Sequence, residues 1–295
     1  SKVECPACVL VFPVLWTGRF LINTEKSKET GVSAEELIYE KKDGVGWIRI
    51  NRPELFNTLD RDGWDRLGDL LIAAGRDKSV GVVVLTGTGE KSFCAGGYLA
   101  DLTSFDTQQA RDLYESGYRA LTAMRRIPQP VIAAVNGVAI GGGNEIVVCA
   151  DLAIASEHAR FGQAGPRVGS APIWGGSNLQ SITLGEKKAR EVAYLCRQYK
   201  AQEALEMGWI NKVVPHDQLI ATVQEWCEEL LDKSPAYLEV TKISSNIWWE
   251  MLAPSIEMGR LAMIRLAGGE EMTEGASAFM AKRKADFRQF RNGAE

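Results

Sequence analysis

The chain has 295 residues, of which 45% are hydrophobic and 24% are charged, and its formal net charge is −4. These values are ordinary for a soluble globular protein, and the length suits one large α/β core with a helical appendage. Phosphate binding needs a concentrated basic face, and no dense run of Lys and Arg precedes the C-terminal tail, so nucleic acid is not expected as a partner.

The first half of the chain predicts an extension followed by alternating strands and helices. Residues 1–34 are expected to form an N-terminal extension, since their apolar run at 9–16 is too short to span a membrane and lacks the flanks of a signal peptide. After Glu35 we expect, in order, strands at 36–40 and 45–50, a helix at 60–74, a strand at 80–85, a helix at 107–126 and a strand at 131–135.

The second half turns gradually all-helical. We expect a helix at 144–150, a strand at 152–155, a Gly/Pro-rich loop at 161–176, helices at 186–195 and 201–207, a short strand at 213–214, and mostly helix from 219 onward. The chain therefore divides into an extension (1–34), a core (35–215) and a C-terminal helical region (216–295). This order predicts an α/β fold, a repeating β-β-α spiral with a helical tail. A doubly wound nucleotide fold is disfavoured, because the glycines lack G-x-G-x-x-G spacing.

Cysteines and histidines limit the chemistry. Cys149, Cys196 and Cys227 lie in apolar segments and are expected to be reduced, as in a cytoplasmic protein. The Cys5–Cys8 pair has CxxC spacing, but neither a second pair nor a nearby histidine completes a zinc site. With only two histidines and no GxSxG elbow, metal clusters and Ser-His-Asp hydrolysis are disfavoured.

Two glycine clusters follow buried strands and are the candidate centre of a site. The first lies at 93–97, and the second, at 137–143, opens a helix whose N-terminus offers free N–H groups and a partial positive charge. Two such turns brought together can each direct one N–H at a single oxygen, which stabilises a thioester oxyanion or enolate. The alternative is that these glycines only form tight turns.

Four motifs occur together in a characteristic order and spacing: Ser-Phe-Cys-Ala-Gly-Gly at 92–97, the glycine turn at 135–145, Asp-Leu-Ala-Ile-Ala at 151–155 and Phe-Gly-Gln at 161–163. In these the chain resembles the crotonase (enoyl-CoA hydratase/isomerase) superfamily, over about residues 35–290. The resemblance implies the β-β-α spiral core, an acyl-CoA substrate, assembly as a homotrimer or hexamer, and no cofactor beyond the coenzyme A of the substrate.

The resemblance also assigns catalytic groups. The family's oxyanion hole falls on the N–H groups of Gly97 and Gly142, and Glu145 matches the first of the two glutamates that enoyl-CoA hydratases use. The second glutamate falls on Gly165, so the usual pair of carboxylates that holds one water is incomplete.

Several branches of the family share longer strings with the chain. Residues 162–170, 185–191 and 195–199 resemble 1,4-dihydroxy-2-naphthoyl-CoA synthases and 2-ketocyclohexanecarboxyl-CoA hydrolases, although an aspartate and a tyrosine that those enzymes use fall on Pro172 and Ala267. Residues 161–166 and 169–171 also resemble 6-oxocyclohex-1-ene-1-carbonyl-CoA hydrolases. We therefore expect water addition to a cyclic enoyl-CoA, hydrolytic opening of an oxo-cyclic acyl-CoA, or both.

Three other functions fit the same motifs. They are a hydratase or isomerase acting on another acyl chain, a lyase like the naphthoyl-CoA synthases, and a catalytically weakened homologue that serves as a scaffold. By the resemblance, Tyr98, Gly165, Ser170 and Trp174 should contact the acyl group, unless Tyr98 and Trp174 only pack in the core. Residues assigned to coenzyme A are Ala95, Phe279 and Lys282, and the alternative for the basic C-terminal segment is a solvated face.

Overall fold

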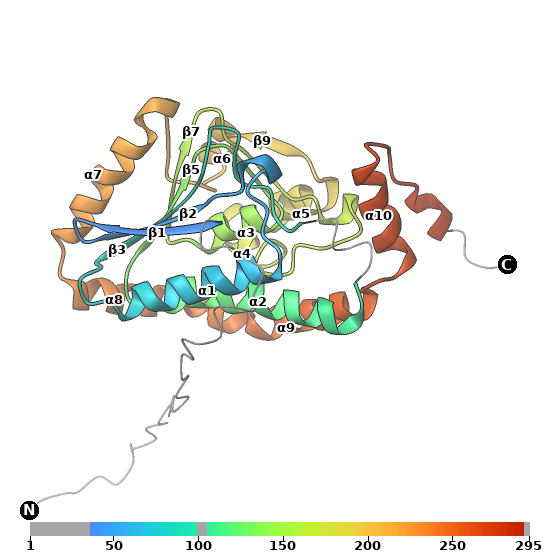
Figure 1. Ribbon diagram of the computed structural model, residues 1–295, viewed down its shortest axis with the longest axis horizontal. Coiled ribbons are helices and arrows are strands. Elements are labelled where there is room, and N and C mark those ends of the chain that lie inside the picture. Colours follow the sequence, from blue (N-terminus) through green and yellow to red (C-terminus); the bar gives the residue numbers. More distant parts are fainter. Residues whose placement is uncertain (1–35, 99–104, 292–295) are drawn as a thin grey trace, which may run out of the picture. The chain divides into compact units, whose positions relative to one another are not determined.

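The structure is a computed structural model that describes residues 36–98 and 105–291; the expected extension at 1–34, with its CxxC pair, lies outside these residues. Its larger sheet has six strands (Figure 1). They lie in the order β1 (Leu37–Lys42), β2 (Val45–Ile50), β3 (Val82–Gly87), β5 (Val131–Val135), β7 (Leu152–Ser156) and β10 (Lys212–Val214). Only the β1–β2 hairpin is antiparallel, and every other neighbouring pair is parallel.

The two faces of this sheet are buried under different helices, because side chains alternate between the faces along each strand. Val83 and Leu85 of β3 belong to a cluster with α1 (Arg61–Arg76) and α2 (Thr107–Arg126). Val82 and Val84 point the other way and pack with α7 (Leu219–Leu231). A parallel sheet covered on both faces explains why its strands read as continuous apolar runs.

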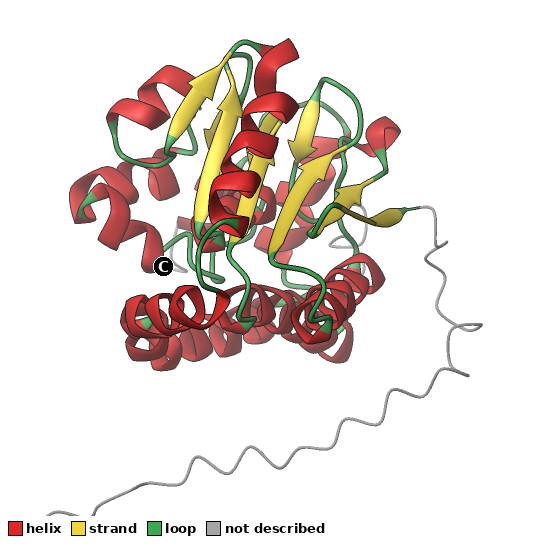
Figure 2. Ribbon diagram, turned by 90° about the vertical axis from the view of Figure 1, so that its left-hand side faces the viewer, coloured by secondary structure: helices red, strands yellow, loops and turns green. Residues whose placement is uncertain are grey.

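The C-terminal region is helical, as expected, and lies over the first helix layer. Figure 2 shows a layer of helices beneath the strands, and in Figure 1 this layer contains α1, α2, α8 (Pro235–Ser245) and α9 (Ile247–Leu266). Tyr118 of α2 stacks on Trp249 of α9 with ring centroids 6.0 Å apart. The remaining described α-helices are α3 (Gly142–Cys149), α4 (Leu179–Leu184), α5 (Glu186–Leu195), α6 (Ala201–Glu206) and α10 (Glu270–Met280).

A second, four-stranded sheet had no clear counterpart among the predicted elements. Its order is β4 (Ser92–Cys94), β6 (Val138–Ile140), β8 (Arg160–Gly162) and β9 (Gln198–Lys200). Each strand has only three residues, too few for an alternation pattern to appear in the sequence. The expected β-β-α spiral with a helical tail is confirmed, and this small sheet positions both glycine turns.

Helix α3 begins at Gly142, two residues earlier than expected. Glycine has a low helix propensity, which moved the predicted start to Asn144. Tertiary contacts override that propensity here: a Cβ on Gly143 would lie 1.8 Å from the Cys94 carbonyl oxygen. Helix α4 (Leu179–Leu184) was not predicted either, since six residues carry too little periodicity.

Candidate active site

The two glycine turns meet because the strands before them are neighbours. β4 and β6 pair in parallel, so their carboxyl ends lie at the same edge of the small sheet. Gly96 has φ +95° and lies against the second turn, where a Cβ would come 3.0 Å from the Ile140 oxygen and 3.1 Å from the Gly142 nitrogen. Any larger residue at this position would separate the turns.

The N–H groups of Gly97 and Gly142 have no hydrogen-bond acceptor among the residues that the structure describes. Gly142 is the first residue of α3, where N–H groups lack intrahelical acceptors. Gly97 forms a parallel bridge with Leu59, in which Leu59 N–H donates to Gly96 O (2.9 Å) and Tyr98 N–H donates to Leu59 O (3.2 Å). Since N–H directions alternate along extended backbone, the Gly97 N–H points away from Leu59. Both turns therefore offer a free donor.

Glu145 lies about one helical turn from Gly142. The side chain is 3% exposed, and its Oε1 accepts hydrogen bonds from the backbone N–H groups of Trp174 (2.7 Å) and Gly176 (3.1 Å). Burial raises the pKa of Glu145 to about 7, against the opposing effect of the two N–H donors. No charged side chain in the described part of the chain contributes to this shift. A carboxyl group that titrates near neutral pH can both accept and return a proton.

Trp174 contributes its backbone to the site and its side chain to the core. Its indole N–H donates to the Tyr114 carbonyl oxygen (3.1 Å), and its ring packs edge-on against Trp64, with centroids 5.0 Å apart. A Cβ on Gly142 would lie 2.9 Å from Trp64 and 3.6 Å from Trp174. Two flat indole rings therefore lie beside the free N–H of Gly142.

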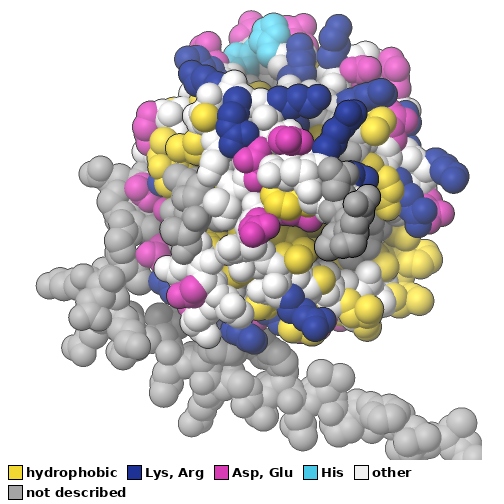
Figure 3. All heavy atoms as spheres, turned by 90° about the vertical axis from the view of Figure 1, so that its right-hand side faces the viewer, with side chains coloured by type: hydrophobic (Ala, Val, Ile, Leu, Met, Phe, Trp, Pro, Cys, Tyr) yellow, Lys and Arg dark blue, Asp and Glu magenta, His cyan; other side chains and the backbone are white. Residues whose placement is uncertain are grey.

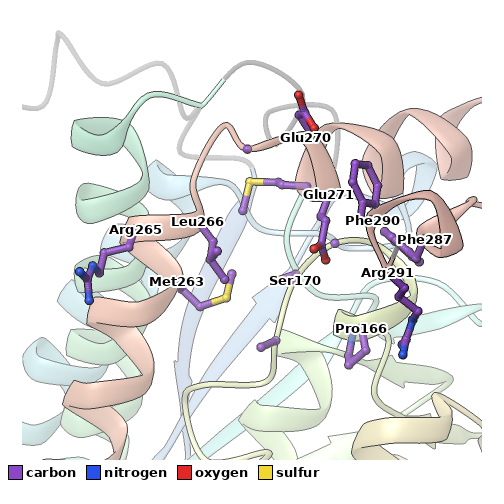
Figure 4. A pocket seen from close by; sticks show the side chains of 14 residues that line it. Pro166, Ser170, Met263, Arg265, Leu266, Glu270, Glu271, Phe287, Phe290 and Arg291 are labelled. Carbon is purple, nitrogen blue, oxygen red and sulfur yellow. The ribbon is translucent and has the colours of Figure 1, made fainter. Parts of the chain in front are cut away.

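Gly165 and Ser170 lie on the outer part of the same loop. Gly165 opens a 3-10 turn (Gly165–Arg167), and a Cβ there would lie 2.8 Å from both Ala171 Cα and the Ser170 oxygen. The position is therefore closed to any side chain. Ser170 lines a cavity of about 660 Å³ between this loop, the α9–α10 junction and the last described turn. Figure 4 shows Met263 and Leu266 extending toward the loop that carries Ser170.

The residues expected to bind coenzyme A come from two parts of the chain. Ala95 lies in the first glycine turn, where its N–H donates to Phe56 O (3.0 Å). Phe279 lies in the last turn of α10 and is exposed, and Lys282, two residues after the helix, has φ +51°. The face toward the C-terminus carries Lys and Arg side chains beside apolar ones (Figure 3). No hydrogen bond or ion pair among the described residues joins Phe279 or Lys282 to Glu145.

Tyr98 lies next to Gly97, and the Arg52 guanidinium lies 5.9 Å from its ring centroid. Arg52 is itself held by Asp60, with Nη1 2.9 Å from Oδ2. Both alternatives for Tyr98, packing and contact with the acyl group, fit this position.

Three residues of the site were not singled out from the sequence. The sequence places Trp64 only within a predicted helix, Gln163 only in a motif, and Gly176 only at the end of a Gly/Pro-rich loop. No local pattern marks them, because only tertiary packing brings Trp64 against Gly142, and Gln163 and Gly176 next to the residues that contact Glu145. A Cβ on Gly176 would lie 2.3 Å from Gln163 Nε2, so this glycine is required by the amide beside it.

Comparisons with known proteins agree with this geometry. The solved enoyl-CoA hydratases of Mycobacterium avium subsp. paratuberculosis and Bacillus anthracis are each 28% identical to the chain, with TM-scores of 0.77 and 0.70, and each match covers 85% of this chain and 98% of the other. A carnitinyl-CoA hydratase from Mycobacterium avium is 30% identical, with a TM-score of 0.76 over 87% of this chain and 100% of its own. Among the described residues, no helix is both long and apolar enough to cross a membrane. A family model for enoyl-CoA hydratase/isomerase matches residues 40–291, and the chain therefore belongs to that family of acyl-CoA enzymes.

Proposed function

We propose that this enzyme adds water to a cyclic enoyl-CoA, hydrolytically opens an oxo-cyclic acyl-CoA, or does both. One observation carries the proposal: Glu145, the one buried carboxyl group among the described residues, lies about one helical turn from the free N–H of Gly142, and the turn that carries Gly97 packs against Gly142 through Gly96. This arrangement supplies one acid/base group and two donors for a thioester oxygen.

In hydration, Glu145 takes a proton from water while the oxygen of that water bonds to the β-carbon. The electron pair of the double bond moves to the thioester oxygen, which accepts hydrogen bonds from Gly97 and Gly142. Glu145 then returns its proton to the α-carbon, so that one water is added in total. Each preorganised donor stabilises the enolate by about 3 kcal/mol.

Ring opening uses the same groups. Glu145 takes a proton from water as the oxygen of that water bonds to the ketone carbon, the bond between that carbon and the α-carbon breaks, and the products are a carboxylic acid and the thioester enolate, to whose α-carbon Glu145 returns the proton. These steps are proton transfers and additions, so coenzyme A is needed only as the carrier of the acyl group.

A flat ring as the acyl group is proposed from the resemblance of residues 161–166 and 169–171 alone, since the indole rings of Trp64 and Trp174 are buried and close the core behind Gly142. A second candidate is isomerisation of an enoyl-CoA on another acyl chain. One carboxylate is enough to move a proton between two carbons, and Glu145 is the one described carboxylate held beside the free N–H groups.

Mass spectrometry of the protein incubated with cyclic enoyl-CoA and 2-oxocyclic acyl-CoA esters tests the proposal. We expect a gain of one water with the ring intact, or an open-chain dicarboxylic mono-CoA ester. A double bond that moves without any gain in mass would favour isomerisation. No change on any ester would contradict the proposal and favour a scaffold.

Glu145→Gln separates an enzyme from a scaffold. It should lower turnover by at least about 100-fold while binding of the ester is retained, because the amide cannot accept the proton. Gln224→Glu, on the exposed side of α7, is a surface control that should leave turnover unchanged.

We further propose a cytoplasmic trimer or dimer of trimers, in which Phe279 and Lys282 reach the coenzyme A of a neighbouring subunit. The free, buried cysteines support the cytoplasmic location, because thiols stay reduced there. The assembly is supported by exposed apolar side chains on α8 and α9, which are Tyr237, Val240, Ile243, Ile247, Trp248, Met251, Met258 and Leu261.

A further inference from the structure

Gln163 is a buried amide with no partner at the edge of the site. The residue is 1% exposed, and neither Nε2 nor Oε1 has a hydrogen-bond partner among the described residues. Buried polar groups in folded proteins are nearly always satisfied, by protein or by ordered water. An amide whose N–H and oxygen both lack partners in the protein therefore points to a bound molecule that can accept one hydrogen bond and donate another.

The position of Gln163 relative to Glu145 follows from the small sheet. Gly162 pairs with Ile140, and its oxygen accepts a hydrogen bond from Gly141 N–H (3.1 Å), so the next residue lies beside the first turn of α3. The Gln163 amide contacts Gly176, whose N–H donates to Glu145 Oε1. Gln163 and Glu145 therefore contact the same residue.

Two further side-chain amides near the same loop, those of Asn144 and Gln180, also have unpaired groups. Asn144 Nδ2 donates to Gln180 Oε1 (3.3 Å), which leaves Asn144 Oδ1 and Gln180 Nε2 without partners. Gln180 N–H donates to Gly175 O (2.9 Å). Two donor and two acceptor groups around residues 174–176 thus have no described partner, and water has complementary hydrogen-bonding capacity.

No side chain at position 165 can supply the missing carboxylate, since the loop closes over that position. We propose that Gln163 holds the reacting water beside Glu145, in the place of the second carboxylate. The amide Nε2–H donates to the water oxygen and Oε1 accepts one of its hydrogens, while Glu145 takes the other hydrogen as the oxygen bonds to the β-carbon. Gln163 itself gains and loses no proton. This inference rests on the proposed hydration.

Gln163→Met tests the role, because methionine has nearly the same length and no hydrogen-bonding amide. Two rates are measured for each protein: water addition to cyclohex-1-ene-1-carbonyl-CoA, and exchange of the α-hydrogen of cyclohexanecarbonyl-CoA in D2O. Exchange needs Glu145 and the free N–H groups but no added water. We expect hydration to fall about 100-fold, as for a misplaced reactant, and exchange to stay within about twofold.

Gln129→Met is the matched control. Gln129 is also buried, but its Nε2 donates to Ala74 O and Val80 O, away from the site. This change should lower the denaturation midpoint and leave both rates unchanged.

Other results would overturn the inference. Equal losses of hydration and exchange in Gln163→Met would show that Gln163 only positions Glu145. Hydration at the wild-type rate would show that it holds no reacting water, while the proposed function would stand. If the wild-type protein itself hydrates no ester, the inference fails, and the proposed function fails with it unless the protein opens the ring of an oxo-cyclic ester.

Discussion

At the scale of single residues, Glu145 should set the pH dependence of the enzyme. Burial raises its pKa to about 7, and the charged form is the one that accepts a proton from water. We therefore expect kcat/KM for hydration to rise tenfold per pH unit below about pH 7 and to level off above it. Initial rates between pH 5 and pH 9 measure this. A kcat/KM that does not change with pH, or that depends equally on a second ionising group, would contradict a single-carboxylate site.

Some residues of the site were predictable and others were not, for a physical reason. Gly97, Gly142 and Glu145 follow strand ends or begin a helix, so the sequence itself indicates where their N–H groups and carboxylate lie. Gln163 and Trp64 reach the site only through the pairing of β6 with β8 and the packing of α1. Such contacts leave no periodic signal along the chain.

At the scale of elements, a buried ion pair joins the C-terminal helices to the core. Lys242 of α8 is 7% exposed, and its Nζ lies 2.7 Å from Asp151 Oδ2 and donates to the carbonyl oxygens of Met124 and Gln129. Asp151 Oδ2 also accepts from Val131 N–H (2.8 Å), at the start of β5. One cation thus connects α8, the end of α2 and the central sheet.

Lys242→Met should lower the free energy of unfolding by about 3–5 kcal/mol, because it leaves a partly buried carboxylate without its partner. Urea denaturation at fixed protein concentration measures the loss. The matched control is Lys41→Met, which removes an exposed pair with Asp77 at 2.8 Å and should lower stability far less, because solvent screens the pair. Equal losses in the two variants would show that burial adds nothing to the pair.

The start of α3 shows where prediction from local patterns fails at this scale. A glycine run is a poor helix start by propensity, yet the helix begins at Gly142 since the backbone of β4 approaches too closely for any side chain. The same approach keeps the Gly142 nitrogen against Gly96, the residue before Gly97. Local propensity gave the wrong boundary at the point where the function requires close packing.

At the scale of the whole molecule, the predicted sequence of strands and helices was largely right, but the sheet order was not predictable from it. Strands β4 and β6 leave the main sheet to pair with each other, so β3 pairs with β5 and β5 with β7. Three-residue strands have no pattern of their own, and only their long-range pairing defines them. The site lies on this second sheet.

Most of the exposed apolar residues of α8 and α9 lie three, four or seven positions apart, which places them along one stripe of each helix. A monomer rarely exposes so continuous a patch, and a homo-oligomer would cover it with other copies of the chain.

Ile243→Glu, at a side chain that is 65% exposed, should therefore disrupt the assembly, because a charge in an apolar interface is costly. Light scattering after size exclusion should show a multiple of 32.4 kDa for the wild type and 32.4 kDa for the variant. Ile220→Glu, on α7 and outside the stripe, is the matched control and should keep the wild-type mass. A wild-type mass of one chain would contradict the trimer, and an unchanged mass in Ile243→Glu would place the contact on another face.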